Sequence, residues 1–150
     1  MTDSRKNVSI LFVCTGNTCR SPMAELLFNS VAPTGVRAES AGLAAFPGVP
    51  MSAAARQVLA ERNISECGFR SRPLTAPLAA AATRIVGMTA AHCREIVSRF
   101  PDCAAKTVIL LPDGGDVPDP FGGDAAAYRR CLERMLPAVR KLAAEFECEQ

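Results

Sequence analysis

The sequence predicts an α/β protein, a three-layer sandwich in which helices cover both faces of a central four-stranded parallel sheet. Short β-rich runs alternate with longer segments of helical periodicity, and the first run leads directly into a loop and a helix start. No internal repeat or linker divides the 150 residues. We therefore expect one domain, 1–150, of a size that buries about 68–70% of the unfolded chain's surface.

Four short segments have the composition of strands. The first, Val8 to Val13, is almost continuously apolar, which is typical of a strand that is covered on both faces. The other three strands are predicted at 36–40, 84–88 and 107–111. Because strands alternate with helical segments, the sheet is expected to be parallel, with a loop that connects its first strand to the helix that follows.

Helix start signals follow the strands. Ser21, with a proline directly after it, predicts a helix with a serine cap. An Ala-rich helix is predicted at 52–61, with Ser52 as its cap. Thr89 is expected to cap a further helix, which ends before Pro101.

The C-terminal part of the chain divides into a loop and one long helix. Gly, Pro and Asp dominate 112–123, which is predicted to be a loop. An apolar stripe at helical spacing predicts an amphipathic helix over 124–147, bent at Pro137. Ligands of parallel sheets bind at the carboxyl ends of the strands, so functional residues are expected where the strands end.

Composition excludes several classes of protein. Hydrophobic residues make up 49% and charged residues 21%, as in globular proteins rather than disordered chains or fibres. The formal net charge is +2 and no run of five or six like charges occurs, so a nucleic-acid partner is not predicted. No apolar run approaches the roughly 20 residues of a membrane helix, so no membrane association is predicted.

The seven cysteines indicate a reducing compartment. Their number is odd and the N-terminus lacks the apolar core of a signal peptide, which together predict a cytoplasmic protein with free thiols. No Cys-x-x-Cys pair occurs, and the one histidine, His92, is interpreted as a structural or surface residue on a helix, so no metal site is predicted. Five thiols are interpreted as core or surface groups: Cys67, Cys93, Cys103, Cys131 and Cys148, with Cys131 on the apolar face of the last helix.

The first predicted strand ends in the octapeptide Cys-Thr-Gly-Asn-Thr-Cys-Arg-Ser, residues 14–21, and a helix follows at once. A loop in this position can point several backbone N–H groups at one centre, where the helix dipole adds positive charge. Gly16 and Asn17 accept the left-handed backbone angles that such a wrap needs. A tetrahedral dianion fits this arrangement, and its binding residues are predicted to be Thr15, Gly16, Asn17, Thr18, Cys19, Arg20 and Ser21.

The same loop carries a candidate nucleophile. Backbone N–H groups and Arg20 favour the thiolate form of Cys14, which attacks phosphorus readily. The guanidinium of Arg20 matches two phosphate oxygens, and Ser21 can hydrogen-bond the sulfur and later help it to leave. Asp119 lies in the loop after the last strand, on the same sheet edge, where it can supply the proton that a phenolate or guanidine leaving group needs.

The string VCTGNTCRSPMAE resembles the signature of the low-molecular-weight protein tyrosine phosphatases, and the similarity runs nearly end to end. The resemblance implies that Cys14 forms a phosphocysteine, that Arg20 binds the phosphoryl oxygens, and that Asp119 acts as general acid and then as general base. It implies no metal or other cofactor. The loop-supporting residues of the family are matched by Asn17 and Ser40, and its second cysteine by Cys19.

The substrate is expected to be a phosphorylated protein, and inorganic phosphate or another oxyanion is expected to occupy the loop. Thr18, together with Asp119-Pro120-Phe121-Gly122-Gly123, resembles the bacterial branch that includes protein-arginine phosphatases. A small hydroxyl wall and a nearby carboxylate suit a polar, cationic phosphoarginine head, so phosphoarginine is favoured slightly over phosphotyrosine. Phe46 and Phe121 are the candidate rings for contact with a phosphotyrosine.

The chain departs from the family at one position and leaves other readings open. Many members have a supporting histidine where this chain has Phe69, which puts the hydrogen bonds of the loop in doubt. A thioredoxin-coupled arsenate reductase is the alternative, with Cys93 and Cys103 as the further thiols that it needs, although their segment lacks the Cys-rich pattern of that group. A non-enzymatic phosphoprotein reader would not need Asp119.

A redox role is also expected for the loop. A thiolate at Cys14 is open to oxidation, and Cys19 is predicted to trap the oxidised form as a disulfide. The oligomeric state and the physiological protein substrate stay open.

Overall fold

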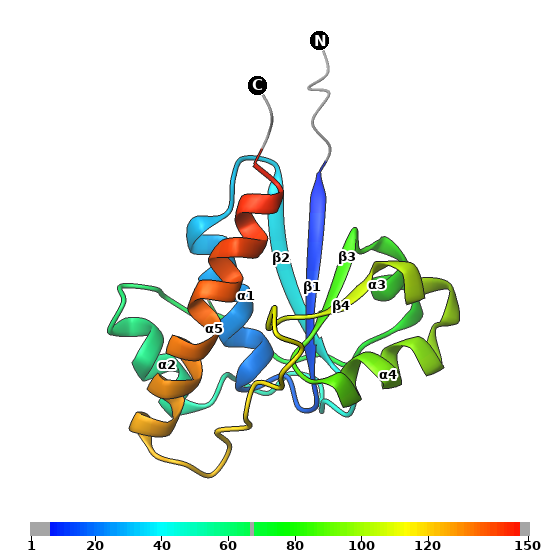
Figure 1. Cartoon of the computed structure of the whole chain (residues 1–150). Helices are drawn as coiled ribbons and strands as arrows, with labels where there is room; N and C mark the ends of the chain where they lie inside the picture. Colours follow the sequence, from blue (N-terminus) through cyan, green and yellow to red (C-terminus); the bar gives the residue numbers. More distant parts are fainter. Residues whose placement is uncertain (1–6, 67, 148–150) are drawn as a thin grey trace.

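The computed structural model describes residues 7–66 and 68–147, so that Cys67 and Cys148 lie outside the described residues. Four parallel strands form one sheet in the order β2-β1-β3-β4 (Figure 1). Their bounds are Val8–Cys14 for β1, Val36–Gly42 for β2, Arg84–Gly87 for β3 and Thr107–Ile109 for β4. Both predictions, a parallel sheet of four strands and a loop after the first strand, are confirmed.

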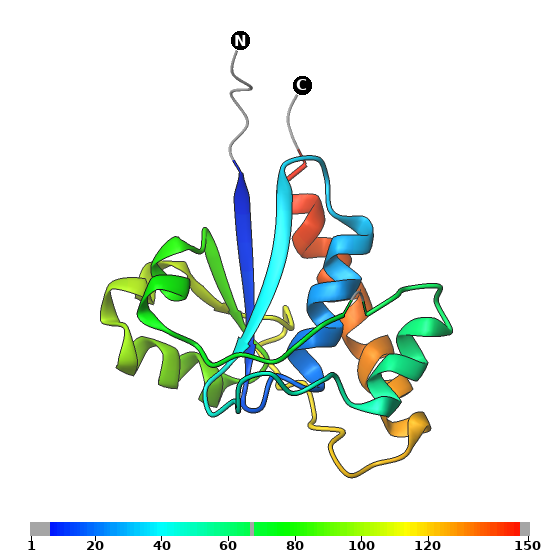
Figure 2. The ribbon, with the colours of Figure 1, turned by 180° about the vertical axis from the view of Figure 1, so that it is seen from behind.

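Helices cover both faces of this sheet (Figures 1 and 2). One side carries α1 (Arg20–Val31), α2 (Ala53–Ala60) and α5 (Ala125–Glu145), and the other carries α3 (Ala76–Ala81), α4 (Ala90–Arg99) and the 3-10 helix η1 (Pro101–Lys106). Alternate side chains of β1 therefore enter two different cores. Phe12 packs on the α1 side and Val13 on the α4 side, which is why this strand is apolar throughout.

Two predicted helix caps are confirmed and one is wrong. Ser52 accepts a hydrogen bond from Ala55 at the start of α2, and Thr89 accepts one from His92 at the start of α4. Helix α1 begins one residue before Ser21, with Cys19 at the cap position and no side-chain cap. The Ser21 hydroxyl lies within hydrogen-bond distance of other side chains of the loop, so it does not cap the helix.

Other differences concern short elements. Helix α3 and the 3-10 helix η1 were not predicted. Each has only six residues, too few to show a helical period in the sequence. Strand β2 extends to Gly42, two residues past its predicted end, whereas β4 ends at Ile109. Helix α5 runs through Pro137. No helix in the described part of the chain has the length and apolar character needed to cross a bilayer.

The carboxyl ends of the strands meet at one edge, where backbone hydrogen bonds hold the connecting loops. The Leu43 N–H donates to Cys14, and the Met88 N–H donates to Val13, so the ends of β2 and β3 flank the end of β1. Gly42 is required here because a Cβ at this position would lie 2.6 Å from the Thr15 carbonyl oxygen. Hydrogen bonds from the chain after β2 and from the chain after β3 thus hold the end of β1, where the loop begins.

Candidate active site

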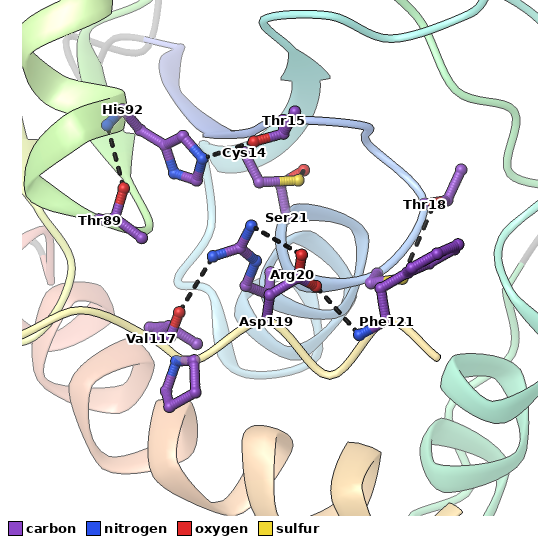
Figure 3. A network of polar contacts seen from close by, with 12 residues as sticks. Cys14, Thr15, Thr18, Arg20, Ser21, Thr89, His92, Val117, Asp119 and Phe121 are labelled. Atoms are coloured by element: carbon purple, nitrogen blue, oxygen red, sulfur yellow. Dashed lines mark hydrogen bonds and ion pairs between the residues drawn. The ribbon is translucent and has the colours of Figure 1, made fainter. Parts of the chain in front are cut away.

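The loop between β1 and α1 forms the floor and wall of a small cavity. Its volume is about 210 Å³, and it is lined by Cys14, Thr15, Gly16, Asn17, Thr18, Cys19, Arg20, Asp119 and Phe121. Every residue predicted to bind phosphate lines this cavity except Ser21, which is fully buried beneath it. The structure thus brings Asp119, from a loop about one hundred positions away in sequence, to the residues around Cys14 (Figure 3).

Asn17 determines the turn of the loop. Its φ is 59°, which confirms the predicted left-handed backbone, and its side chain is fully buried. The same prediction is wrong for Gly16, which is not among the described glycines with positive φ. The loop thus turns with Asn17 in the left-handed region and Gly16 outside it.

The amide of Asn17 makes three hydrogen bonds. Its Nδ2 donates to the Ser21 hydroxyl at 2.9 Å and to the Ser40 hydroxyl at 3.0 Å, and its Oδ1 accepts from the Arg72 backbone N–H at 2.9 Å. Support from the segment of Phe69 therefore comes through the backbone N–H of Arg72. The predicted supporting positions of Asn17 and Ser40 agree with this geometry.

A half-buried carboxyl group, that of Glu25, ends this chain of hydrogen bonds. The Ser40 hydroxyl donates to Glu25 Oε1 at 2.6 Å. Burial raises the pKa of Glu25, and the hydrogen bond from Ser40 opposes that effect. Glu25 is not among the predicted site residues, although it stands within the signature string. Its one signal in the sequence is that of an acidic residue on a helix with apolar neighbours.

A hydroxyl group from the start of α1 lies next to the candidate nucleophile. Cys14 Sγ lies 2.9 Å from Ser21 Oγ, and both groups are buried. Because Ser21 Oγ accepts from Asn17, its own proton is available to a thiolate. This contact agrees with the predicted hydrogen bond between Ser21 and the sulfur.

Opposite charges lie at the mouth of the cavity. Arg20 is only 7% exposed, and its Nη1 donates to the Val117 carbonyl oxygen at 3.0 Å. Its Nη2 lies 3.6 Å from Asp119 Oδ2, and this carboxylate is more than half exposed. Asp119 Oδ1 accepts from the Phe121 N–H at 3.0 Å, which places the exposed Phe121 ring at the rim (Figure 3). A bound anion would thus meet a guanidinium and a carboxyl group together.

Cys19 lies under the loop against Tyr128 of α5. Its Sγ is 3.2 Å from Tyr128 Oη and 3.8 Å from Ser52 Oγ. Burial and the contact with Cys19 raise the pKa of Tyr128 to about 12, so the phenol keeps its proton. Helix α5 therefore contacts the phosphate loop through the Tyr128 hydroxyl.

His92 lies beside the loop rather than at the surface. Its side chain is buried, and Nε2 is 3.0 Å from Thr15 Oγ1. Burial and the nearby charge of Arg20 lower the pKa of His92 to about 4, so the ring is neutral at neutral pH. The sequence offered no signal for this contact, because 77 positions separate the two residues.

The remaining described thiols lie apart from the loop residues or beneath the Asp119 loop. Cys103 and Cys131 are buried and Cys93 is half-buried. Burial raises the pKa of Cys131 to about 12, and its Sγ is 3.8 Å from the Pro118 carbonyl oxygen. Within residues 7–66 and 68–147, no group of three His, Cys, Asp or Glu side chains is placed to hold a metal ion.

This geometry suits transfer of a tetrahedral group. The Cys14 sulfur lines the cavity, the Arg20 guanidinium can bind two oxygens of such a group, and the Asp119 carboxylate lies 3.6 Å from that guanidinium. Such a combination of nucleophile, anion donor and proton donor is what displacement at phosphorus requires.

Comparisons with known proteins agree with this geometry. A curated protein-arginine-phosphatase from Geobacillus stearothermophilus is 41% identical over 145 residues, covering 94% of this chain and 97% of that protein. A probable low molecular weight protein-tyrosine-phosphatase from Ralstonia nicotianae is 38% identical over 135 residues. The match covers 87% of this chain and 90% of that protein. The solved structure of the YwlE arginine phosphatase from Geobacillus stearothermophilus superposes with a TM-score of 0.88 at 39% identity, covering 92% of each chain.

The family model described as low molecular weight phosphotyrosine protein phosphatase matches residues 9–150, almost the whole chain. This match contains the complete loop from Cys14 to Ser21 and the Asp119 segment. By this match and by its relatives, the chain belongs to the low molecular weight phosphotyrosine protein phosphatase family.

Proposed function

We propose that the protein is a cysteine-dependent phosphatase that removes phosphoryl groups from phosphorylated arginine side chains of proteins. The observation that carries this proposal is the wall of the 210 Å³ cavity, because Thr18 and Asp119 line the same cavity as Cys14. A relative named protein-arginine-phosphatase at 41% identity supports the same substrate class. Free thiols at the five described cysteines accord with a cytoplasmic location, which is part of the proposal.

In the first step the Cys14 thiolate attacks phosphorus and the bond from phosphorus to the arginine nitrogen breaks. Arg20 holds two phosphoryl oxygens as charge develops on them. Asp119, in its protonated form, gives its proton to the departing guanidine nitrogen, so that a neutral guanidine leaves and a carboxylate remains. The product on the enzyme is a phosphocysteine at Cys14.

In the second step water attacks the phosphocysteine. Asp119, now a carboxylate, takes a proton from the water, and the sulfur departs as a thiolate. The Ser21 hydroxyl, 2.9 Å from this sulfur, stabilises its returning negative charge. Inorganic phosphate leaves, and both Cys14 and Asp119 regain their starting protonation states.

The preference for phosphoarginine follows from the polarity of the cavity wall. A guanidine is planar and polar, and its remaining N–H groups need acceptors once they are taken out of water. The hydroxyl of Thr18 and the carbonyl oxygen of the protonated Asp119 carboxyl group are such acceptors. A branched apolar residue at position 18 would leave these N–H groups unpaired and would favour an aromatic ring instead.

Parallel turnover assays test the proposal. The same peptide sequence is prepared with phosphoarginine or with phosphotyrosine, and kcat/KM is measured for both with wild type and with Cys14→Ser as the control. We expect a higher kcat/KM for phosphoarginine and no turnover by Cys14→Ser, which should still bind inorganic phosphate or vanadate because the backbone donors and Arg20 remain. A higher kcat/KM for phosphotyrosine would overturn the substrate class, and an active Cys14→Ser would remove the nucleophile assignment.

Phosphotyrosine is the second candidate substrate. It is favoured by the exposed ring of Phe121 at the cavity rim and by the Ralstonia relative with a tyrosine phosphatase name. The arsenate reductase alternative is not favoured by the relatives.

A further inference from the structure

The single histidine of the chain contacts the residue that follows the proposed nucleophile. His92 Nε2 lies 3.0 Å from Thr15 Oγ1, and only 6% of the residue's surface is exposed (Figure 3). The other ring nitrogen, Nδ1, is buried and has no hydrogen-bond partner among the described residues. Buried polar atoms in folded proteins nearly always have partners, so an apolar side chain would be better accommodated here if packing were the only requirement.

Several features of the fold aim the ring at the loop. Thr89 caps α4 by accepting from the His92 N–H, which places the histidine in the first turn of the helix. Gly87 lets this turn approach β3 closely, because a Cβ there would lie 2.7 Å from Cys93 Sγ and 3.4 Å from His92 Cβ. The Met88 N–H donates to Val13, so the same turn lies beside the end of β1. A residue at position 92 therefore faces the loop.

The charge of the surroundings keeps the ring neutral. The charged groups that act on it are Arg20 from α1, which disfavours its protonation, and Asp116 and Asp119 from the loop before α5, which favour protonation. Burial and Arg20 outweigh the two carboxylates. A neutral imidazole has one N–H and one lone pair, so Nε2 and the Thr15 hydroxyl form one oriented hydrogen bond.

We propose that His92 is a positioning residue for phosphoryl transfer, which acts through the Thr15 hydroxyl to hold the start of the phosphate-binding loop in the shape that receives the anion. The inference rests on the proposed phosphatase activity and is independent of the choice between phosphoarginine and phosphotyrosine. His92 does not touch the reacting atoms. It fixes Thr15, whose neighbour Cys14 forms the floor of the cavity.

Four variants test whether the two residues act together. His92→Leu and Thr15→Val each remove one partner of the hydrogen bond, the double variant removes both, and His92→Gln keeps a polar side chain that can reach Thr15. The readouts are kcat and KM for para-nitrophenyl phosphate and the inhibition constant of inorganic phosphate at neutral pH. Ile96→Val is the control, because Ile96 lies on the buried face of α4, belongs to the core on that side of the sheet and does not line the cavity.

We expect His92→Leu to lower kcat/KM and phosphate affinity by roughly 3- to 10-fold, the effect of one hydrogen bond. Thr15→Val should lower kcat/KM and phosphate affinity by a similar factor. In the double variant, neither quantity should fall further than in the more impaired single variant. His92→Gln should keep most of the wild-type activity. Ile96→Val should lower thermal stability but leave kcat/KM and the inhibition constant of phosphate unchanged. Additive losses in the double variant, or a folded His92→Leu with wild-type constants, would overturn the proposal.

A spectroscopic measurement on the wild type protects the test against variants that fail to fold. Because the chain has one histidine, ¹⁵N-histidine labelling yields a single pair of ring signals. We expect one fixed tautomer in the wild type, a changed tautomer in Thr15→Val and a shift of the wild-type signals when inorganic phosphate binds. Identical ring signals in wild type and Thr15→Val would contradict the proposal. Wild-type protein inactive on every phosphorylated substrate would instead contradict the proposed function.

Discussion

The Ser21 hydroxyl lies 2.9 Å from the Cys14 sulfur, and it reaches this position as the second residue of α1 rather than as the helix cap. The oxygen of Ser21 accepts a hydrogen bond from Asn17, which leaves its proton for the thiolate. Both groups are buried, so the contact is shielded from water. The sulfur proposed as the nucleophile thus has an oriented hydrogen-bond donor.

Ser21→Ala should slow the breakdown of the phosphocysteine more than its formation, because the departing thiolate loses its donor. Hydrogen bonds to charged groups contribute about 1.5–3 kcal/mol, so we expect kcat to fall roughly 10- to 100-fold. A rapid-mixing assay with para-nitrophenyl phosphate should show a burst of product followed by slow turnover. Ser30→Ala is the control, since Ser30 lies near the other end of α1 and donates to Leu27. No burst and an unchanged kcat in Ser21→Ala would contradict this role.

Asp119→Asn should lower kcat/KM by roughly 10²- to 10⁴-fold for poor leaving groups, the usual contribution of a general acid. An activated ester such as para-nitrophenyl phosphate needs less protonation, so its loss should be smaller. The measurement compares a series of aryl phosphates with leaving groups of increasing basicity. Equal losses over the whole series would indicate that Asp119 only shapes the loop, through its contact with Arg20 at 3.6 Å.

Thr18→Ile should move the ratio of phosphoarginine to phosphotyrosine turnover towards tyrosine, because an apolar side chain replaces a hydroxyl in the cavity wall. The ratio of the two kcat/KM values is the readout. Thr18→Val, which keeps the shape of threonine, separates the loss of the hydroxyl from the added bulk. If the ratio stays constant in both variants, Thr18 does not select the substrate.

Mild peroxide should inactivate the protein reversibly through a disulfide between Cys14 and Cys19. Formation of this bond requires Cys19 to leave Tyr128, whose hydroxyl lies 3.2 Å from its sulfur. After peroxide and then dithiothreitol, wild type should recover its activity and Cys19→Ser should not, because the oxidised Cys14 then lacks a trapping thiol. Equal recovery in both proteins would exclude Cys19 as the partner.

Acid should destabilise the fold partly through His92. The unfolded ring takes up a proton near pH 6.5, whereas burial and Arg20 lower the pKa of folded His92 to about 4. The unfolded state therefore binds more protons between these values, and the free energy of unfolding falls as the pH is lowered from 6.5 to 4, by on the order of 1–3 kcal/mol. Urea unfolding measures the free energy of unfolding at pH 6.5 and at pH 4. The difference between the two values should be smaller for His92→Gln than for wild type. An equal difference in the two proteins would exclude His92 as a source of the acid destabilisation.

Much of the fold could be predicted from local signals. The strand at Val8–Cys14 is apolar on both faces because two layers of helices cover it, and this pattern is visible in one stretch of sequence. Strong caps at Ser52 and Thr89 mark two helix starts correctly. Helix α3 has only six residues, too few for a period, and the cap assigned to Ser21 failed because other side chains of the loop compete for its hydroxyl.

The sequence by itself determined which residues form the loop and its chemistry: Cys14, Arg20 and the left-handed Asn17 stand within seven positions, and the strand before them and the helix after them are locally encoded. Only the tertiary structure decided what surrounds that loop. Contacts of Thr15 with His92 and of Cys19 with Tyr128 span 77 and 109 positions, and that of Ser40 with Glu25 joins a strand to a helix. Such contacts depend on how helices pack on the sheet, and a hydrogen bond formed only after packing leaves no periodic signal in the chain.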